Sequence, residues 1–171
     1  MNWEQQQMID MARKSRFLEL VEQKQDIVHK ICGLYAVNTD DRKDLSQEIV
    51  CQLWKSYQSF RGDSKFTTWM YKVALNTALL NLRRYRCRVR TESLKEHHVD
   101  IPAEVADPEK HGKISRLYEA INQLRKFDRA IILLYLEQFT YREIAEVTGI
   151  SEANVSVRLA RITKKLEELL K

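Results

Sequence analysis

Apolar residues recur at helical spacing along most of this chain, and that periodicity restricts it to a helical fold. The periodic stretches cover residues 17–35, 45–57, 66–80 and 114–124, and residues 130–136 are apolar on nearly all sides, which predicts a buried helix. Only 4 glycines and 2 prolines occur among the 171 residues, and such a shortage of chain-reversing residues favours helices over sheets. We therefore expect an all-α protein.

The composition changes abruptly at Thr91. Residues 91–113 contain both prolines, three of the four histidines and six acidic residues, and they show little periodicity. A stretch of this kind is typical of a flexible linker. We therefore expect two small helical domains, residues 1–90 and 114–171, joined by an acidic linker over residues 91–113.

The segment from Thr140 to Lys165 has the pattern of a helix-turn-helix. Thr140 with Glu143 three residues later predicts a capping box, Gly149 can take the left-handed conformation that ends a helix, and Ser151 can cap the next one. An ordinary amphipathic helix pair would explain the charges but not this combination of caps and turn. The pattern therefore predicts binding to double-stranded DNA.

Two features of the first half also indicate function. Asp44, Gln47 and Glu48 share one helical face, which could hold a basic protein partner, although a solvated helix face has the same pattern. Aromatic and basic residues alternate from Phe60 to Trp69 around a glycine, as in a platform for unstacked bases, with a core position as the alternative for Trp69. The helix that follows is expected to present Tyr71, Lys72 and Asn76.

These strings together resemble the extracytoplasmic-function group of bacterial sigma factors. The similar segments are D-L-x-Q-E at 44–48, F-R-G-D-S-K-F-T-T-W-M-Y-K-V-A-L-N-T-A at 60–78, and T-Y-R-E-I-A at 140–145 with the G-I-S that starts the second helix. The resemblance implies a sigma factor that directs RNA polymerase to promoters, with region 2 in 1–90 and region 4 in 114–171. It also implies recognition of −10 and −35 elements and capture of the melted non-template strand, without any bond chemistry of its own.

The resemblance assigns residues to three interfaces. Contact with core polymerase is implied for Asp44, Leu45, Gln47, Glu48 and Trp54. Contact with the −10 element and its melted strand is implied for Phe60, Arg61, Gly62, Asp63, Ser64, Phe66, Trp69, Lys72, Asn76, Arg83 and Arg84. Contact with the −35 element is implied for Arg129, Thr140, Tyr141, Ser156, Val157, Arg158, Ala160, Arg161 and Lys164.

The chain departs from the group's usual pattern at several positions. Arg125 stands where members usually have proline, and Gln138 stands where they usually have glycine. In the second helix of the motif, Ser156, Val157 and Ala160 replace the residues that many members carry. The −35 sequence of those members is therefore not carried over to this chain.

The expected partners are the clamp helices of the polymerase β′ subunit, the β flap, single- and double-stranded promoter DNA, and an anti-sigma factor. A net charge of +5 is compatible with nucleic acid as a partner. No cofactor or metal is expected, because the three cysteines are widely spaced and the pair His97 and His98 lies in the linker. No signal sequence or membrane-length apolar run is present, so we expect a cytoplasmic protein without membrane insertion.

Three other functions are alternatives to that of a sigma factor. A stand-alone transcription regulator would leave segments 44–54 and 60–78 without a role. An enzyme with an appended DNA-binding domain needs a catalytic set, and His29, Cys32, Cys51 and the scattered acids of residues 1–90 form none. An anti-sigma factor or other interaction module would not need the base-reading residues.

Overall fold

The computed structural model describes residues 3–36, 38–89 and 108–171. The predicted all-α fold is confirmed. The described residues form eight helices: α1 (Trp3–Glu22), α2 (Gln25–Tyr35), α3 (Thr39–Tyr57), α4 (Phe66–Val89), α5 (Pro108–Asn122), α6 (Lys126–Leu136), α7 (Tyr141–Thr148) and α8 (Glu152–Leu170). Helix α5 thus begins inside the range expected to be linker. The histidine pair at 97 and 98 lies outside the described residues.

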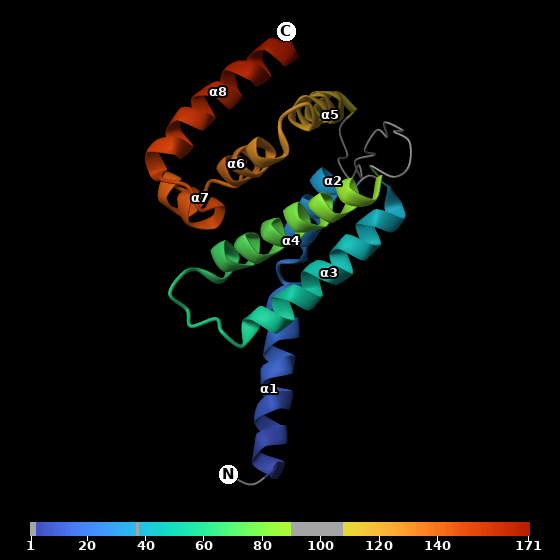
Figure 1. Ribbon diagram of the computed structural model, residues 1–171, viewed down its shortest axis with the longest axis vertical. Helices are drawn as coiled ribbons and strands as arrows, with labels where there is room; N and C mark the ends of the chain where they lie inside the picture. Colours follow the sequence, from blue (N-terminus) through green and yellow to red (C-terminus); the bar gives the residue numbers. More distant parts are fainter. Residues whose placement is uncertain (1–2, 37, 90–107) are drawn as a thin grey trace.

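Helices α2, α3 and α4 pack on one another and form the core of the first half. The most deeply buried side chains come from all three helices and include Ile31, Ile49, Leu53 and Met70, each 0% exposed. Helix α1 joins this core only near its C-terminal end, where the Phe17 ring lies 5.0 Å from that of Trp54. The rest of α1 projects away from the body (Figure 1).

The second half, α5 to α8, is built around α6. Five consecutive residues of that helix, 130–134, are buried, as predicted for this apolar stretch, whereas Tyr135 and Leu136 at its end are exposed. Ile144 of α7 and Val155 of α8 complete the centre of this half, both fully buried.

The predicted caps are confirmed in the second half. Thr140 accepts a hydrogen bond from the Glu143 amide, and the Glu143 carboxylate accepts one from the Thr140 amide, so the capping box is complete. Gly149 ends α7 with φ of 73°, a left-handed conformation that glycine adopts without steric cost. Ser151 then caps α8 by accepting from the Asn154 amide.

The two halves pack against each other along a seam between α2 and α4 on one side and α6 and α7 on the other. The Tyr71 ring of α4 meets the Phe139 ring edge-on, with centroids 5.1 Å apart. Lys30 forms an ion pair with Glu137 at 2.7 Å, and the Tyr35 hydroxyl donates to the Lys126 carbonyl at 2.8 Å. The sequence predicted the two halves but not this contact between them.

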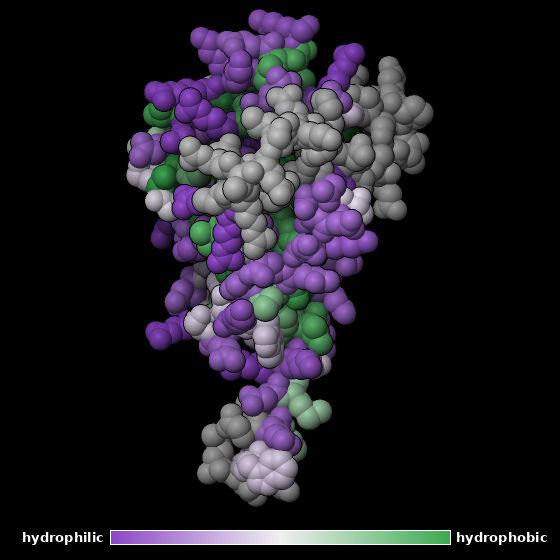
Figure 2. Space-filling model, turned by 45° about the vertical axis from the view of Figure 1, so that its right-hand side comes forward, coloured by the Kyte–Doolittle hydropathy of each residue, from purple (hydrophilic) through white to green (hydrophobic). Residues whose placement is uncertain are grey.

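Hydrophobic residues are sparse on one face of the molecule (Figure 2). Figure 2 shows a largely hydrophilic face on which hydrophobic residues appear as small separate areas. None of the helices in the described part of the chain is long and apolar enough to cross a membrane.

The backbone explains both departures from the group's pattern near α6. Arg125 precedes α6 with φ of −60°, the value to which a proline ring is fixed, so arginine occupies a conformation that also suits proline. Gln138 has φ of 61° and is the one residue other than glycine with positive φ among the described residues. A side chain at such a φ is strained, which accounts for the glycine that members usually carry there.

We predict that Gln138→Gly raises the free energy of unfolding by about 0.5–1 kcal/mol, because relief of the left-handed strain exceeds the added entropy of the unfolded chain. Urea unfolding followed by circular dichroism measures the change. The matched control is Gly149→Ala, which introduces the same strain at the end of α7 and should destabilise the protein by a similar amount. Destabilisation by Gln138→Gly would contradict the assignment of strain.

Candidate nucleic-acid and partner interfaces

The outer face of α3 carries the acidic and amide residues that were predicted to hold a protein partner. Asp44 and Gln47 are exposed, and Glu48 is half-buried and accepts a hydrogen bond from the Gln52 side chain at 2.8 Å. Leu45, which the resemblance placed in the same interface, is only 4% exposed. Its side chain packs into the core of the first half, so it supports the polar face from below and does not lie on it.

This polar face of α3, formed by Asp44, Gln47 and Glu48, is a ridge between two grooves. On one side a polar groove of about 520 Å³ lies between α3 and α4, and it is lined by Asp44, Glu48, Gln52, Ser56, Val73, Asn76, Thr77, Leu80, Asn81 and Arg84. On the other side a more apolar groove lies between α1 and α3, and it is lined by Lys14, Phe17, Leu18, Ser46, Gln47, Val50, Cys51 and Trp54. The predicted partner residues Asp44 and Gln47 therefore face different grooves.

The loop before α4 carries a cluster of aromatic rings. The Trp69 ring lies 5.0 Å from that of Phe60 and 5.3 Å from that of Phe66, measured between centroids. All three side chains are half-buried, so part of each ring remains accessible. At the tip of the loop Arg61, Gly62 and Asp63 are exposed, and Gly62 has φ of 80°.

Beyond this loop, α4 presents a polar and basic line to solvent. Lys72, Asn76 and Arg83 are exposed and fall on one side of the helix, and Arg84 is exposed next to them. Tyr71, which was expected to share this surface, does not: it is 1% exposed and packs on Phe139 in the seam. Burial and the nearby Glu137 carboxylate raise the pKa of its hydroxyl above the usual value.

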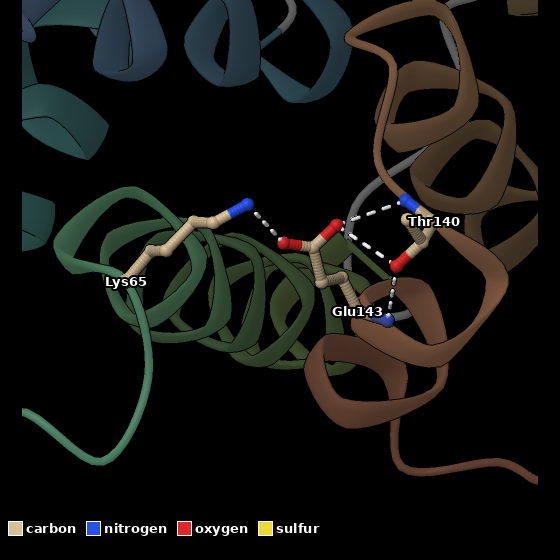
Figure 3. Close-up of polar contacts among 3 residues, drawn as sticks. All are labelled: Lys65, Thr140 and Glu143. Carbon is tan, nitrogen blue, oxygen red and sulfur yellow. Dashed lines mark hydrogen bonds and ion pairs between the residues drawn. The ribbon is translucent and has the colours of Figure 1, made fainter.

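The first helix of the helix-turn-helix is tied to the aromatic loop by one carboxylate. Glu143 accepts hydrogen bonds from the Thr140 amide and hydroxyl, both at 2.9 Å, and from the Lys65 ammonium group at 2.8 Å (Figure 3). Lys65 first, and then the two Thr140 donors, lower the pKa of Glu143 to about 2. The capping box thus also links the two halves of the molecule.

The second helix of the motif, α8, divides into a buried and an exposed face. Val155, Leu159, Ile162 and Leu166 face the core. The opposite face is exposed along its whole length, and from it project the residues predicted to contact DNA: Ser156, Val157, Arg158, Ala160, Arg161 and Lys164. An exposed helix of this length with small and basic side chains fits the major groove.

Two arginines that were assigned to DNA are held by protein groups. Arg158 lies over the Phe127 ring, 5.2 Å from its centroid, and pairs with Asp128 at 2.9 Å. Arg129 donates to the carbonyl oxygens of Leu34, Leu124 and Asn122. Their assignment to the −35 element stays a prediction. The spacing of residues along the chain does not indicate these protein contacts, because each arginine reaches groups on other helices.

The remaining predicted residues of the motif, Thr140 and Tyr141, are exposed at the start of α7. Tyr141 lies beside the exposed Tyr135, with ring centroids 6.4 Å apart. Among the described residues, no group of three or more His, Cys, Asp or Glu side chains could hold a metal ion.

Comparison with known protein families matches both halves of the chain. Residues 20–88 match the model described as sigma-70 region 2, and residues 114–166 match the model described as sigma-70, region 4. The matched ranges include the α3 ridge, the aromatic loop, the exposed line of α4 and the helix-turn-helix. Most of α1 lies before the first matched residue.

Individual relatives agree with these models. The chain is 30% identical to the ECF RNA polymerase sigma-E factor of Haemophilus influenzae over 93% of this chain and 89% of that one. It is 31% identical to the ECF RNA polymerase sigma factor SigE of Mycolicibacterium smegmatis, over 94% of this chain but only 64% of that longer relative. A solved structure of the sigma factor RpoE in complex with the anti-sigma factor NepR, from Bartonella quintana, has a similar fold, with a TM-score of 0.77 and 21% identity over 91% of this chain and 96% of that one.

We predict that Glu143→Gln makes the free energy of unfolding less dependent on pH between pH 6 and pH 2. The pKa of the Glu143 carboxyl group is about 2 in the folded protein and about 4.3 in an unfolded chain. The ionised carboxylate therefore stabilises the folded state fully above about pH 4.3, and this stabilisation is lost as the pH falls toward 2. Urea midpoints measured from pH 6 to pH 2 should therefore fall less steeply for Glu143→Gln than for the wild type. The control Glu146→Gln, an exposed acid on the same helix, should follow the wild type, and equal slopes for all three proteins would contradict the role of Glu143.

Proposed function

The chain belongs to the extracytoplasmic-function group of the sigma-70 family, and on that premise we propose how it works as an RNA polymerase sigma factor in transcription initiation. It binds core polymerase through the α3 ridge and reads two promoter elements with separate halves. As a sigma factor it is not itself an enzyme.

The observation that carries the proposal is the placement of three interaction surfaces on one chain. The α3 ridge, the aromatic loop with the α4 line, and the outer face of α8 are all accessible and chemically different. A stand-alone regulator would need only the last of them. An initiation factor needs all three, because it must hold polymerase, duplex DNA and melted DNA at the same time.

We assign the α3 ridge to the β′ clamp helices. Asp44 and Gln47 are exposed and can pair with basic and polar side chains of a partner, while Trp54 at the apolar groove offers a hydrophobic anchor. The polar groove lies between the ridge and α4, and Asn76 and Arg84 line its far side. A partner bound to α3 therefore lies next to the DNA-reading side of α4.

We assign the aromatic loop and the α4 line to the −10 element and its melted strand. Taking a base out of a duplex costs a few kcal/mol, and stacking on an aromatic ring stabilises the unpaired base by about 1–3 kcal/mol. Phe60, Phe66 and Trp69 supply partly accessible rings beside the basic Arg61. Lys72, Asn76, Arg83 and Arg84 then follow the strand along α4.

We assign α8 to the −35 element, with its exposed face in the major groove. Ser151 and Gly149 fix the entry of this helix, and Ser156, Val157, Ala160 and Arg161 face outward where base edges would lie. Lys164 is placed for a phosphate contact. An anti-sigma factor is proposed as a further partner, since the solved structure of similar fold contains one.

The proposal requires the seam between the halves to open. Elements at −10 and −35 are about 25 base pairs apart, which is about 85 Å of duplex at 3.4 Å per base pair. In the structure, however, Lys65 of the aromatic loop touches Glu143 of the helix-turn-helix at 2.8 Å. The two reading surfaces can engage their elements together only after the second half has moved away from the first.

Run-off transcription tests the proposal directly. Purified core polymerase is assayed with and without the protein on a library of promoter fragments that includes the DNA upstream of its own gene. Transcripts that depend on the protein support the proposal. Specific duplex binding without polymerase and no dependent transcript would favour the stand-alone regulator.

We predict that Asp44→Ala combined with Gln47→Ala weakens binding to core polymerase by about tenfold or more, since two exposed contacts of the interface are removed. Fluorescence anisotropy of the labelled protein titrated with core measures the affinity. Glu19→Ala with Gln23→Ala is the matched control, because it removes an acid and an amide from exposed positions outside the ridge. Unchanged affinity of the first variant, with its circular dichroism spectrum intact, would contradict the assignment of the ridge.

We predict that a covalent bridge across the seam blocks initiation. Lys30→Cys and Glu137→Cys replace an ion pair of 2.7 Å, and a short bis-maleimide can join them in a protein that also carries Cys51→Ser and Cys87→Ser. The bridged protein should still bind core polymerase but lose run-off transcription, whereas the same protein capped with a monofunctional maleimide should retain it. Equal transcription by both forms would show that the seam stays closed during initiation.

A further inference from the structure

Val157 is an unusual residue for the place it occupies on α8. It lies on the exposed side of the helix, is 50% exposed, and takes no part in the hydrophobic core. The buried side of the same helix is formed by Val155, Leu159, Ile162 and Leu166. Helix stability does not favour valine at an exposed position, because branching at Cβ restricts its rotamers in a helix.

The surroundings of Val157 are polar groups that can hydrogen-bond to bases. Asn154 and Arg161 are exposed on one side of it, at three residues before and four residues after, and Ser156 is exposed on the other. Arg158 is withdrawn toward α6, where Asp128 and the Phe127 ring hold it. Val157 is therefore the one large apolar side chain on this exposed face of α8, with only the small side chains of Ala153 and Ala160 as apolar neighbours.

We infer that Val157 selects for thymine in the −35 element by contact with the C5-methyl group. This inference rests on the proposed function of α8 and adds the chemical group that it reads. Among the base edges of the major groove, thymine alone presents an apolar group. A valine cannot hydrogen-bond to the other bases, and it would bury any of their donors or acceptors without a partner, which disfavours them.

Removing one methyl group from an apolar contact weakens binding by about 4-fold, the equivalent of one buried CH₂ group. Ordering Val157 costs little, because its side chain already has one preferred rotamer in a helix. The contact is therefore large enough to measure against a single base change.

Replacement of thymine by deoxyuridine tests the inference, because it removes the methyl group and changes nothing else in the base pair. Core polymerase with the full chain first selects promoters from a library with a randomised upstream element and a fixed −10 element. Each thymine of the selected upstream element is then replaced by deoxyuridine, one at a time, and the affinity of the holoenzyme for each duplex is measured. At one position the replacement should lower affinity about 4-fold, while replacements in the DNA between the upstream element and the −10 element should have no effect.

Two variants then assign the methyl contact to a residue. With Val157→Ala the duplexes with thymine and with deoxyuridine at that position should bind equally. Thr163→Ala is the matched control, since it shortens another β-branched, exposed residue of α8, and it should keep the 4-fold difference.

The outcomes separate this inference from the function on which it rests. Selected elements without thymine, indifference to deoxyuridine at every position, or a methyl effect that survives Val157→Ala would each overturn the inference while leaving the sigma factor assignment in place. Failure of the holoenzyme to form or to initiate on any library member would overturn the proposed function, and the inference with it.

Discussion

The guanidinium group of Arg129 holds together the point where the two halves meet. It donates to carbonyl oxygens of Leu34 near the end of α2, of Asn122 at the end of α5, and of Leu124 in the turn before α6. Carbonyl groups at helix ends lack partners within the helix, and they carry partial negative charge. Neither α2 nor α5 has a basic residue in its own last turn, so Arg129 supplies from α6 the charge that both helix ends lack. Burial lowers the pKa of this group, as expected for a cation taken out of water.

Much of the local structure could be predicted from the sequence, because it depends on neighbours in the chain. Thr140, Glu143, Gly149 and Ser151 set the limits of α7 and α8 through caps that span three or four residues. The exposed face of α8 could also be predicted, because the apolar residues of this helix recur every three or four positions and leave the opposite face polar. For the same reason the position of Leu45 could have been recognised, since it continues the apolar stripe of Ile49 and Leu53 and not the polar ridge.

The parts that escaped prediction depend on residues far apart in the chain. Tyr71 stands in the middle of a string that resembles a DNA-reading helix, and only its contact with Phe139, from the other half, shows that it is buried. Lys65 and Glu143 each belong to a motif of their own, and neither motif indicates the other. Periodicity reports which face of a helix is apolar, but it does not report which helix will cover that face.

The projection of helix α1 from the body determines where the molecule unfolds locally. Its contacts with the body run from Arg13, which lies over the Tyr57 ring, to Phe17 and Val21, whereas Trp3, Met8 and Met11 are at least 65% exposed. The side chains of Trp3, Met8 and Met11 add little to the core, so the early turns of α1 depend on propagation from the anchored end for much of their order. Protection of backbone amides against hydrogen exchange therefore declines along α1 toward its N-terminus, and the helix frays from Trp3 while the body of the protein stays folded.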